Sequence, residues 1–209
     1  MNNIREFQKF DAELVKPKVI LICGARRTGK TAKGFRLLEN FLAKGKEVYV
    51  LGFPPVLPAE IKIVNDIEDV PNDSVLLIDE ADTIYSSRRS MRKKHLTLNK
   101  ILKLTGQKDI TIIMIVHSTA NIDINVIRQM DVLIICNLSL LQVDTDRTLI
   151  RWHLQTAKEI FKHFPEEERN SLAYIYSDDF RGMIKFSLPS FWSTQISRAF
   201  ANYNMWAEI

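Results

Sequence analysis

Apolar runs of strand length alternate with segments of helical periodicity along most of this chain. Such alternation is typical of a mostly parallel sheet with helices on both faces. The unbroken apolar start of VLLIDEAD indicates a strand buried on both faces, KVILICG is a first buried strand, and DITIIMIVHS is the most β-branched run of the chain. The runs predicted as strands are residues 18–24, 46–53, 61–66, 75–82, 109–118 and 131–138, followed by a closing hairpin of 172–178 and 182–189.

Three segments have the spacing of amphipathic helices. The first carries Phe35, Leu38, Phe41 and Leu42 and is expected to end at Gly45. The second covers residues 96–104. The third runs from about Asp144 to Phe164, with a stripe predicted at Leu149, Trp152, Thr156, Ile160 and Phe164. The aromatic segment FWSTQISRAF near the end is also helix-like, and its pattern leaves open whether it packs on its own core or on a neighbour.

The chain of 209 residues is short enough for one core, so we expect a single domain spanning residues 1–209. Cys23 and Cys136 lie in apolar runs and are expected to be buried thiols rather than disulfide or metal partners. No run approaches the roughly 18 apolar residues of a membrane span. The sequence therefore predicts a cytoplasmic protein without a membrane span.

The segment GARRTGKT, residues 24–31, lies between the first predicted strand and the first predicted helix. It satisfies G-x-x-x-x-G-K-[ST], a loop whose backbone N–H groups cradle phosphates. Lys30 would reach the terminal phosphates, and the Thr31 hydroxyl would ligate Mg²⁺. The predicted nucleotide-binding residues are Gly24, Ala25, Arg26, Arg27, Thr28, Gly29, Lys30, Thr31 and Ala32. The side chains of Arg26 and Arg27 are not needed for a main-chain cradle and are expected to face outward.

Two acidic residues end the buried run SVLLIDEAD. Asp79 is predicted to hold Mg²⁺ through its water shell, since Mg²⁺ takes few carboxylates. Glu80 is the predicted general base, because a carboxylate beside the metal ligand can orient and deprotonate an attacking water. The pair indicates hydrolysis of a nucleotide rather than its storage.

The strand after the Asp-Glu strand ends at His117. This order along the chain is typical of the additional-strand, catalytic-glutamate class of P-loop NTPases, an α/β fold of three layers. In that class the extra strand inserts beside the loop strand, and its last polar residue senses the terminal phosphate. His117 is therefore the predicted sensor.

GARRTGKT, SVLLIDEAD and IVHSTANIDINVIRQMDVLI resemble motifs of the FtsK–HerA superfamily of DNA-pumping ATPases. The resemblance covers roughly residues 18–138, and the short chain looks most like the viral genome-packaging ATPases, including those of archaeal turreted icosahedral viruses. The family usually has Gln where this chain has His117, and His can also donate a hydrogen bond to phosphate.

The resemblance implies a homo-oligomeric ring that uses ATP and Mg²⁺ to move double-stranded DNA into a capsid. A capsid or membrane-associated viral protein would be a further partner. The ATPase itself would be located in the host cytoplasm or in the virion. The alternatives are a Zot-like phage assembly or secretion ATPase, a family that usually carries a membrane span, and a small P-loop phosphotransferase with an acceptor other than water.

Positive charge is concentrated between Arg88 and Lys108, where no acidic residue occurs. Phosphate contacts are independent of sequence and suit a motor that moves along any DNA. The predicted DNA contacts are Arg88, Arg89, Arg92, Lys93 and Lys94. A second basic line, Arg147, Arg151, Lys158 and Lys162, is expected to be solvated or to contact a subunit.

The family resemblance also implies an arginine finger supplied by another subunit, which stabilises the transition-state charge. The candidates are Arg128, Arg88, Arg89, Arg147 and Arg151.

Overall fold

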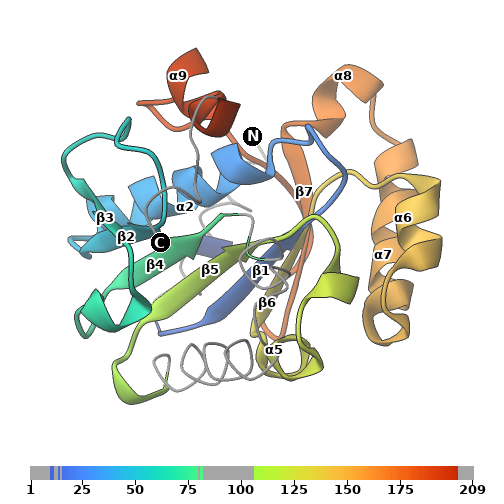
Figure 1. Cartoon of the computed structure of the whole chain (residues 1–209). Coiled ribbons are helices and arrows are strands. Elements are labelled where there is room, and N and C mark those ends of the chain that lie inside the picture. Colours follow the sequence, from blue (N-terminus) through green and yellow to red (C-terminus); the bar gives the residue numbers. More distant parts are fainter. Residues whose placement is uncertain (1–9, 12–13, 15, 80, 82–105, 202–209) are drawn as a thin grey trace.

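The computed structural model describes residues 10, 11, 14, 16–79, 81 and 106–201. The described residues form one eight-stranded sheet in the order β3-β2-β4-β5-β1-β6-β7-β8 (Figure 1). The strands are β1 Val19–Cys23, β2 Val48–Leu51, β3 Ile61–Val64, β4 Val75–Ile78, β5 Thr111–Ile115, β6 Val132–Ile135, β7 Leu172–Ser177 and β8 Arg181–Lys185. Every predicted strand is therefore present.

The first six strands in this order are parallel, and β7 and β8 join them as an antiparallel hairpin. β5 lies between β1 and β4, with Ile22 opposite Ile115 and Ile78 opposite Met114. This insertion confirms the additional-strand class of P-loop NTPase fold. Because neighbouring parallel strands end at one edge, the residues after β1, β4 and β5 come together there.

Helices cover both faces of the sheet, which confirms the three-layer arrangement (Figure 1). Helix α2 (Lys30–Ala43) packs on one face, where a Cβ added to Gly34 would lie 2.7 Å from Ile115 Cδ1. The C-terminal helix α9 (Thr194–Ser197) lies on the same side as α2. The opposite face is covered by α5 (Ile124–Gln129) and α7 (Thr148–Lys162).

Helix α2 ends where the glycine signal predicts. The N–H of Gly45 donates to Leu42 O, and the N–H of Lys46 donates to Phe41 O. These are the two hydrogen bonds of a Schellman motif, which places the glycine at a positive φ, here +79°. The predicted strand, loop and helix are thus observed as β1, the loop and α2, in the predicted order along the chain.

The prediction of the third helix is wrong at its start, because the helix is interrupted at Asp146 and Arg147. Residues Leu140–Thr145 form a separate helix, α6, and α7 begins at Thr148. The Asp146 carboxylate accepts hydrogen bonds from the backbone N–H of Arg147 and from Thr119. An aspartate that bonds a distant segment holds its own backbone out of the helix, so the break is a tertiary effect.

The predicted stripe of α7 is wrong in its first half, whereas Ile160 and Phe164 are half-buried and pack against the core. Leu149 and Trp152 are 55% and 57% exposed. The buried residues of the helix are instead Ile150, Leu154, Ala157 and Phe161. Apolar residues occupy two adjacent faces of this helix, and periodicity alone did not show which one meets the sheet.

The remaining short elements are η1 (Ile67–Asp69), η2 (Thr119–Asn121), α8 (Glu166–Arg169) and η3 (Ala199–Ala201). Cys23 and Cys136 are buried free thiols, as predicted. In the part of the chain that the structure describes, no helix combines the length and apolar character needed to cross a membrane. Glu80, the predicted helix of 96–104 and the five predicted DNA contacts of 88–94 lie outside the described residues.

Candidate nucleotide site

The segment between β1 and α2 forms a compact loop around its own backbone. Gly24 and Gly29 have φ values of +149° and +76°, and Arg27 also has a positive φ of +63°. The Thr28 hydroxyl donates to Ala25 O at 2.7 Å, and the N–H of Ala25 donates to Asn137 O at 2.9 Å. The loop is therefore hydrogen-bonded both to itself and to Asn137, two residues after the end of β6.

Gly24 is required because β6 passes directly beside it. A Cβ at this position would lie 2.7 Å from Cys136 Cβ, and the backbone φ disfavours any other L-residue. We expect Gly24→Ala to lower the free energy of unfolding by about 3 kcal/mol through overpacking and backbone strain. Denaturant unfolding of the variant measures this loss.

Gly45→Ala is the matched control for this substitution. Gly45 also has a positive φ, +79°, but no atom lies within 4 Å of an added Cβ. Its substitution should cost only the backbone strain, about 1 kcal/mol. Equal losses for the two variants would show that the close approach of β6 contributes nothing.

Lys30 lies at the start of α2 with its side chain turned back over the loop. It is only 6% exposed, and its Nζ donates to Gly24 O at 3.0 Å and Ala25 O at 2.8 Å. The ammonium is thus held directly above the loop backbone. A phosphate at this position would meet a charged donor whose geometry is already set.

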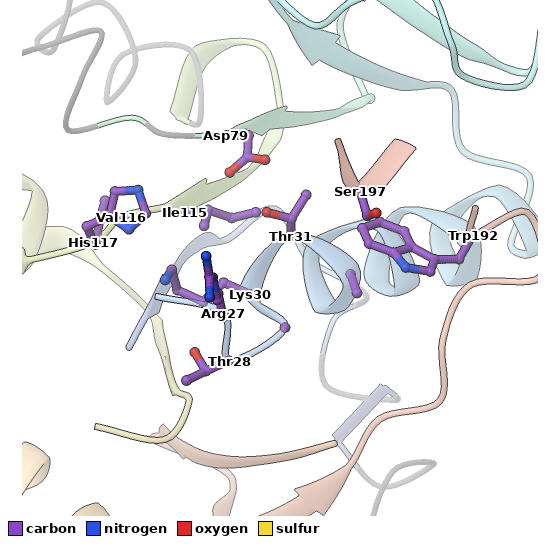
Figure 2. A pocket seen from close by; sticks show the side chains of 12 residues that line it. Arg27, Thr28, Lys30, Thr31, Asp79, Ile115, Val116, His117, Trp192 and Ser197 are labelled. Atoms are coloured by element: carbon purple, nitrogen blue, oxygen red, sulfur yellow. The ribbon is translucent and has the colours of Figure 1, made fainter. Parts of the chain in front are cut away.

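Around this loop lies a pocket of about 300 Å³ that gathers the predicted groups from three strand ends. Lys30 and Thr31 come from the loop after β1, Asp79 from the end of β4, and His117 from the segment after β5. Figure 2 shows Asp79 over the space between Lys30 and Thr31, with His117 on the far side of Lys30 from Thr31. Of the predicted binding residues, Arg27, Thr28, Gly29, Lys30, Thr31 and Ala32 line the pocket.

The donor set fits a magnesium nucleotide. A buried carboxylate, Asp79, and the hydroxyl of Thr31 line the same space, and oxygen atoms of these types are the ligands that Mg²⁺ prefers. Backbone N–H groups at the start of α2 and the Lys30 ammonium supply the positive field that a triphosphate needs. The arrangement can bind a phosphate chain and place its end near Asp79 and His117.

A second lysine, Lys33, supports the loop from beneath and was not anticipated from the sequence. It is 2% exposed, and its Nζ donates to Thr28 O at 2.9 Å and to Asn170 O at 2.7 Å. Burial lowers the pKa of this ammonium and raises the pKa of the neighbouring Cys136 thiol. Lys33 therefore connects the phosphate loop to the segment between α8 and β7.

The segment that carries His117 is held by α6 and by the α6–α7 junction. Gln142 Nε2 donates to His117 O. The guanidinium of Arg147 donates to the carbonyls of Thr119, Ala120 and Ile122, and Asp146 accepts from Thr119. These contacts fix the backbone around the predicted sensor.

The structure places some of the arginines where they were expected and others elsewhere. Arg26 and Arg27 are exposed as expected, although Arg27 also lines the pocket. Arg147 donates to carbonyls of its own chain, and Arg151 donates to Asp146 O at 3.0 Å, so solvation alone does not describe either residue; a subunit contact stays a prediction. Arg128 is exposed on α5. Which arginine acts in trans stays a prediction.

Two pocket residues, Trp192 and Ser197, were not predicted. Both belong to the aromatic C-terminal segment, far along the chain from the loop. Its aromatic side chains were visible in the sequence, but nothing in the local pattern indicates that the segment crosses α2. The structure also answers where this segment packs, because Phe191 and Phe200 contact Phe35 and Phe53 of the chain's own core.

The family model of Zonular occludens toxin (Zot) matches residues 59–141. This range includes β3, β4, β5 and β6 and therefore both Asp79 and His117. No curated protein sequence matches the chain.

Several solved structures share the fold. The genome packaging NTPase B204 from Sulfolobus turreted icosahedral virus 2, in complex with AMPPCP, has a TM-score of 0.58 at 12% identity and covers 83% of this chain and 99% of its own. The pCW3 conjugation coupling protein TcpA with ATPγS has a TM-score of 0.57 at 11% identity, covering 81% of this chain and 60% of that one. ATPases 2 and 3 of EssC from Geobacillus thermodenitrificans have a TM-score of 0.53 at 13% identity, over 82% of this chain and 40% of theirs. At these identities the similarity shows the fold alone.

Proposed function

We propose that this protein is an ATPase that couples hydrolysis to movement of double-stranded DNA, in a ring that packages a viral genome. One observation carries the proposal: the phosphate loop, Asp79 and His117 surround a single pocket at the carboxyl ends of β1, β4 and β5. Ligands of open parallel sheets bind at this edge, and phosphates bind at helix N-termini.

The proposed roles rest on the residues that line the pocket and, for Glu80, on its place in the sequence. Lys30 binds the terminal phosphates, and Thr31 and Asp79 hold Mg²⁺, which neutralises charge on the phosphate chain. Glu80 follows Asp79 directly and activates the attacking water. His117 contacts the terminal phosphate and reports its loss to α6 and η2 through the hydrogen bonds of Gln142 and Arg147.

DNA is the proposed polymer because of the charge distribution. Eight lysines and arginines and no acidic residue occur between Arg88 and Lys108, against a net charge of +4 for the whole chain. The fold is also shared with a genome packaging NTPase and a conjugation coupling protein. A ring of identical subunits, docked to a capsid or to a membrane-associated viral protein, would place these basic segments around the duplex.

ATP hydrolysis measured with and without duplex DNA, over a range of salt concentrations, tests the proposal. We expect magnesium-dependent hydrolysis that duplex DNA stimulates at low salt, with the stimulation disappearing as salt rises, because phosphate contacts release counterions. Hydrolysis that duplex DNA leaves unchanged at every salt concentration would contradict the motor function. Transfer of the phosphoryl group to an acceptor other than water would identify a kinase.

Neutralising the basic segment provides a prediction about the DNA contacts. We expect replacement of Arg88, Arg89, Arg92, Lys93 and Lys94 by glutamine to weaken duplex binding equally for unrelated sequences. The slope of log affinity against log salt should also become shallower by about 0.9 for each phosphate that the variant no longer neutralises. Fluorescence anisotropy with two unrelated duplexes measures both quantities.

The matched control removes five positive charges elsewhere on the surface. It replaces the exposed lysines Lys16, Lys44, Lys62, Lys162 and Lys185 with glutamine. This protein should keep most of the salt slope. If the slope falls equally in both variants, the DNA contacts are not specific to the 88–94 segment.

A Zot-like assembly or secretion ATPase is the second candidate, and the match to residues 59–141 favours it. Such an enzyme would use the same phosphate loop and the same hydrolysis but export a nucleoprotein. Protein-stimulated rather than DNA-stimulated hydrolysis would favour this candidate.

A further inference from the structure

The C-terminal segment supplies one wall of the nucleotide pocket. After β8 the chain passes over α2, and both Trp192 and Ser197 line the same space as Lys30 and Thr31 (Figure 2). No role in the proposed hydrolysis uses either residue. Their presence calls for an occupant of this end of the pocket.

This wall is fixed by packing and hydrogen bonds. The rings of Phe191 and Trp192 lie 6.0 and 6.1 Å from the ring of Phe35 on α2, measured between centroids. The N–H of Ser190 donates to Glu39 Oε1 at 2.8 Å. Ser193 caps α9 by accepting from the N–H of Ile196, which is 4% exposed. The indole of Trp192 is therefore held in place before any ligand binds.

The pocket has two chemically different ends. His117 lies at one end, Lys30, Asp79 and Thr31 lie between, and Trp192 and Ser197 lie at the other end (Figure 2). If the terminal phosphate lies beside Lys30 and Asp79 on the side of His117, the rest of the nucleotide must extend past Thr31 toward the indole. A flat apolar surface beside a hydroxyl suits a nucleobase and its sugar.

We propose that Trp192 is the stacking platform for the base of the bound nucleotide and that Ser197 contacts the base or sugar beside it. This inference rests on the proposed function, because it assumes that a nucleoside triphosphate occupies the phosphate loop. It adds the nucleoside subsite, which the phosphate-loop motif does not locate.

Stacking also determines which nucleotides the site accepts. Every base has a π-face, so stacking tolerates different bases and discriminates by the strength of the stack rather than by hydrogen-bonding pattern. ATP and GTP should therefore bind within a few-fold of each other, and CTP more weakly than either.

The test compares ligands with and without a base. Binding of ATP and of inorganic tripolyphosphate, each with Mg²⁺, is measured by calorimetry for the wild type, Trp192→Ala and Trp192→Phe. We expect Trp192→Ala to weaken ATP on the order of ten-fold, the scale of one base–aromatic stack, and to leave tripolyphosphate unchanged. Trp192→Phe should retain most of the ATP affinity.

Trp152→Ala is the matched control, because Trp152 is 57% exposed on α7 and does not line the pocket. It should bind both ligands as the wild type does. If Trp192→Ala weakens the binding of ATP and of tripolyphosphate equally, or weakens the binding of neither, the proposal that Trp192 stacks on the base is wrong. If the wild type binds neither ligand, the proposed function itself fails, and the two failures are thereby distinguished.

A fluorescence measurement keeps the test valid if Trp192→Ala does not fold. Replacing Trp152 and Trp206 with phenylalanine leaves Trp192 as the single tryptophan of the chain. ATP should change the emission of this indole, and tripolyphosphate should not. ATP that binds by calorimetry without altering the emission would overturn the proposal.

Discussion

Lys30→Met should abolish binding of Mg·ATP at millimolar concentration while leaving the protein folded. The Lys30 ammonium is buried and lines the pocket, and its Nζ donates to Gly24 O and Ala25 O. Two charge-assisted hydrogen bonds to phosphate oxygens would contribute about 3–6 kcal/mol. Their loss corresponds to a decrease in affinity of about 10²- to 10⁴-fold.

Methionine is chosen because it preserves the side-chain volume at a residue that is 6% exposed. The variant's thermal unfolding midpoint should stay close to that of the wild type, since removing a buried cation also removes its desolvation cost. Lys44→Met, at the exposed end of the same helix, is the matched control and should bind ATP normally. Normal ATP binding by Lys30→Met would show that the loop is not the phosphate site.

Glu80→Gln should bind Mg·ATP as the wild type does and yet hydrolyse it about 10²-fold more slowly or worse, the scale of a lost general base. The expectation rests on the sequence position of Glu80, directly after the pocket residue Asp79. Glutamine keeps the size of the side chain and one acceptor oxygen but cannot accept the proton of water. Single-turnover hydrolysis, measured beside equilibrium binding, separates the two effects.

Asp79→Asn provides the contrast for this substitution. If Asp79 holds the metal, its variant should need more Mg²⁺ for binding and turnover, whereas Glu80→Gln should keep the wild-type dependence on Mg²⁺. The exposed residue Glu167 supplies the control Glu167→Gln, which should change neither quantity. A Glu80→Gln enzyme with normal turnover would remove Glu80 from the mechanism.

The phosphate loop and the strands around it could be located from the amino-acid sequence. GARRTGKT is contiguous, and its geometry depends on backbone N–H groups and on two glycines at positive φ. A loop of this kind is specified by its own residues, so it was located without knowing the rest of the fold. Asp79 and His117 could also be located from the sequence, because each follows a buried strand and the end of the apolar run marks the end of that strand.

The insertion of one strand beside the loop strand was also predicted, since the motif order identified the class of fold. The insertion of β5 between β1 and β4 then brought Asp79 and His117 to the same edge as Lys30. Local motifs and a common topology were sufficient to locate the part of the site that contains Lys30, Asp79 and His117.

The other contacts could not be predicted from local patterns, because they join residues that are distant along the chain. Lys33 donates to Asn170 across 137 positions, and Thr119 donates to Asp146 across 27, where the carboxylate breaks the predicted helix. The buried face of α7 depended on which apolar side meets the sheet. Trp192 reaches the pocket because β8 returns the chain over α2, where the aromatic rings pack on Phe35. The periodicity of the sequence shows which residues are apolar, but the packing of the whole core determines which residues they contact.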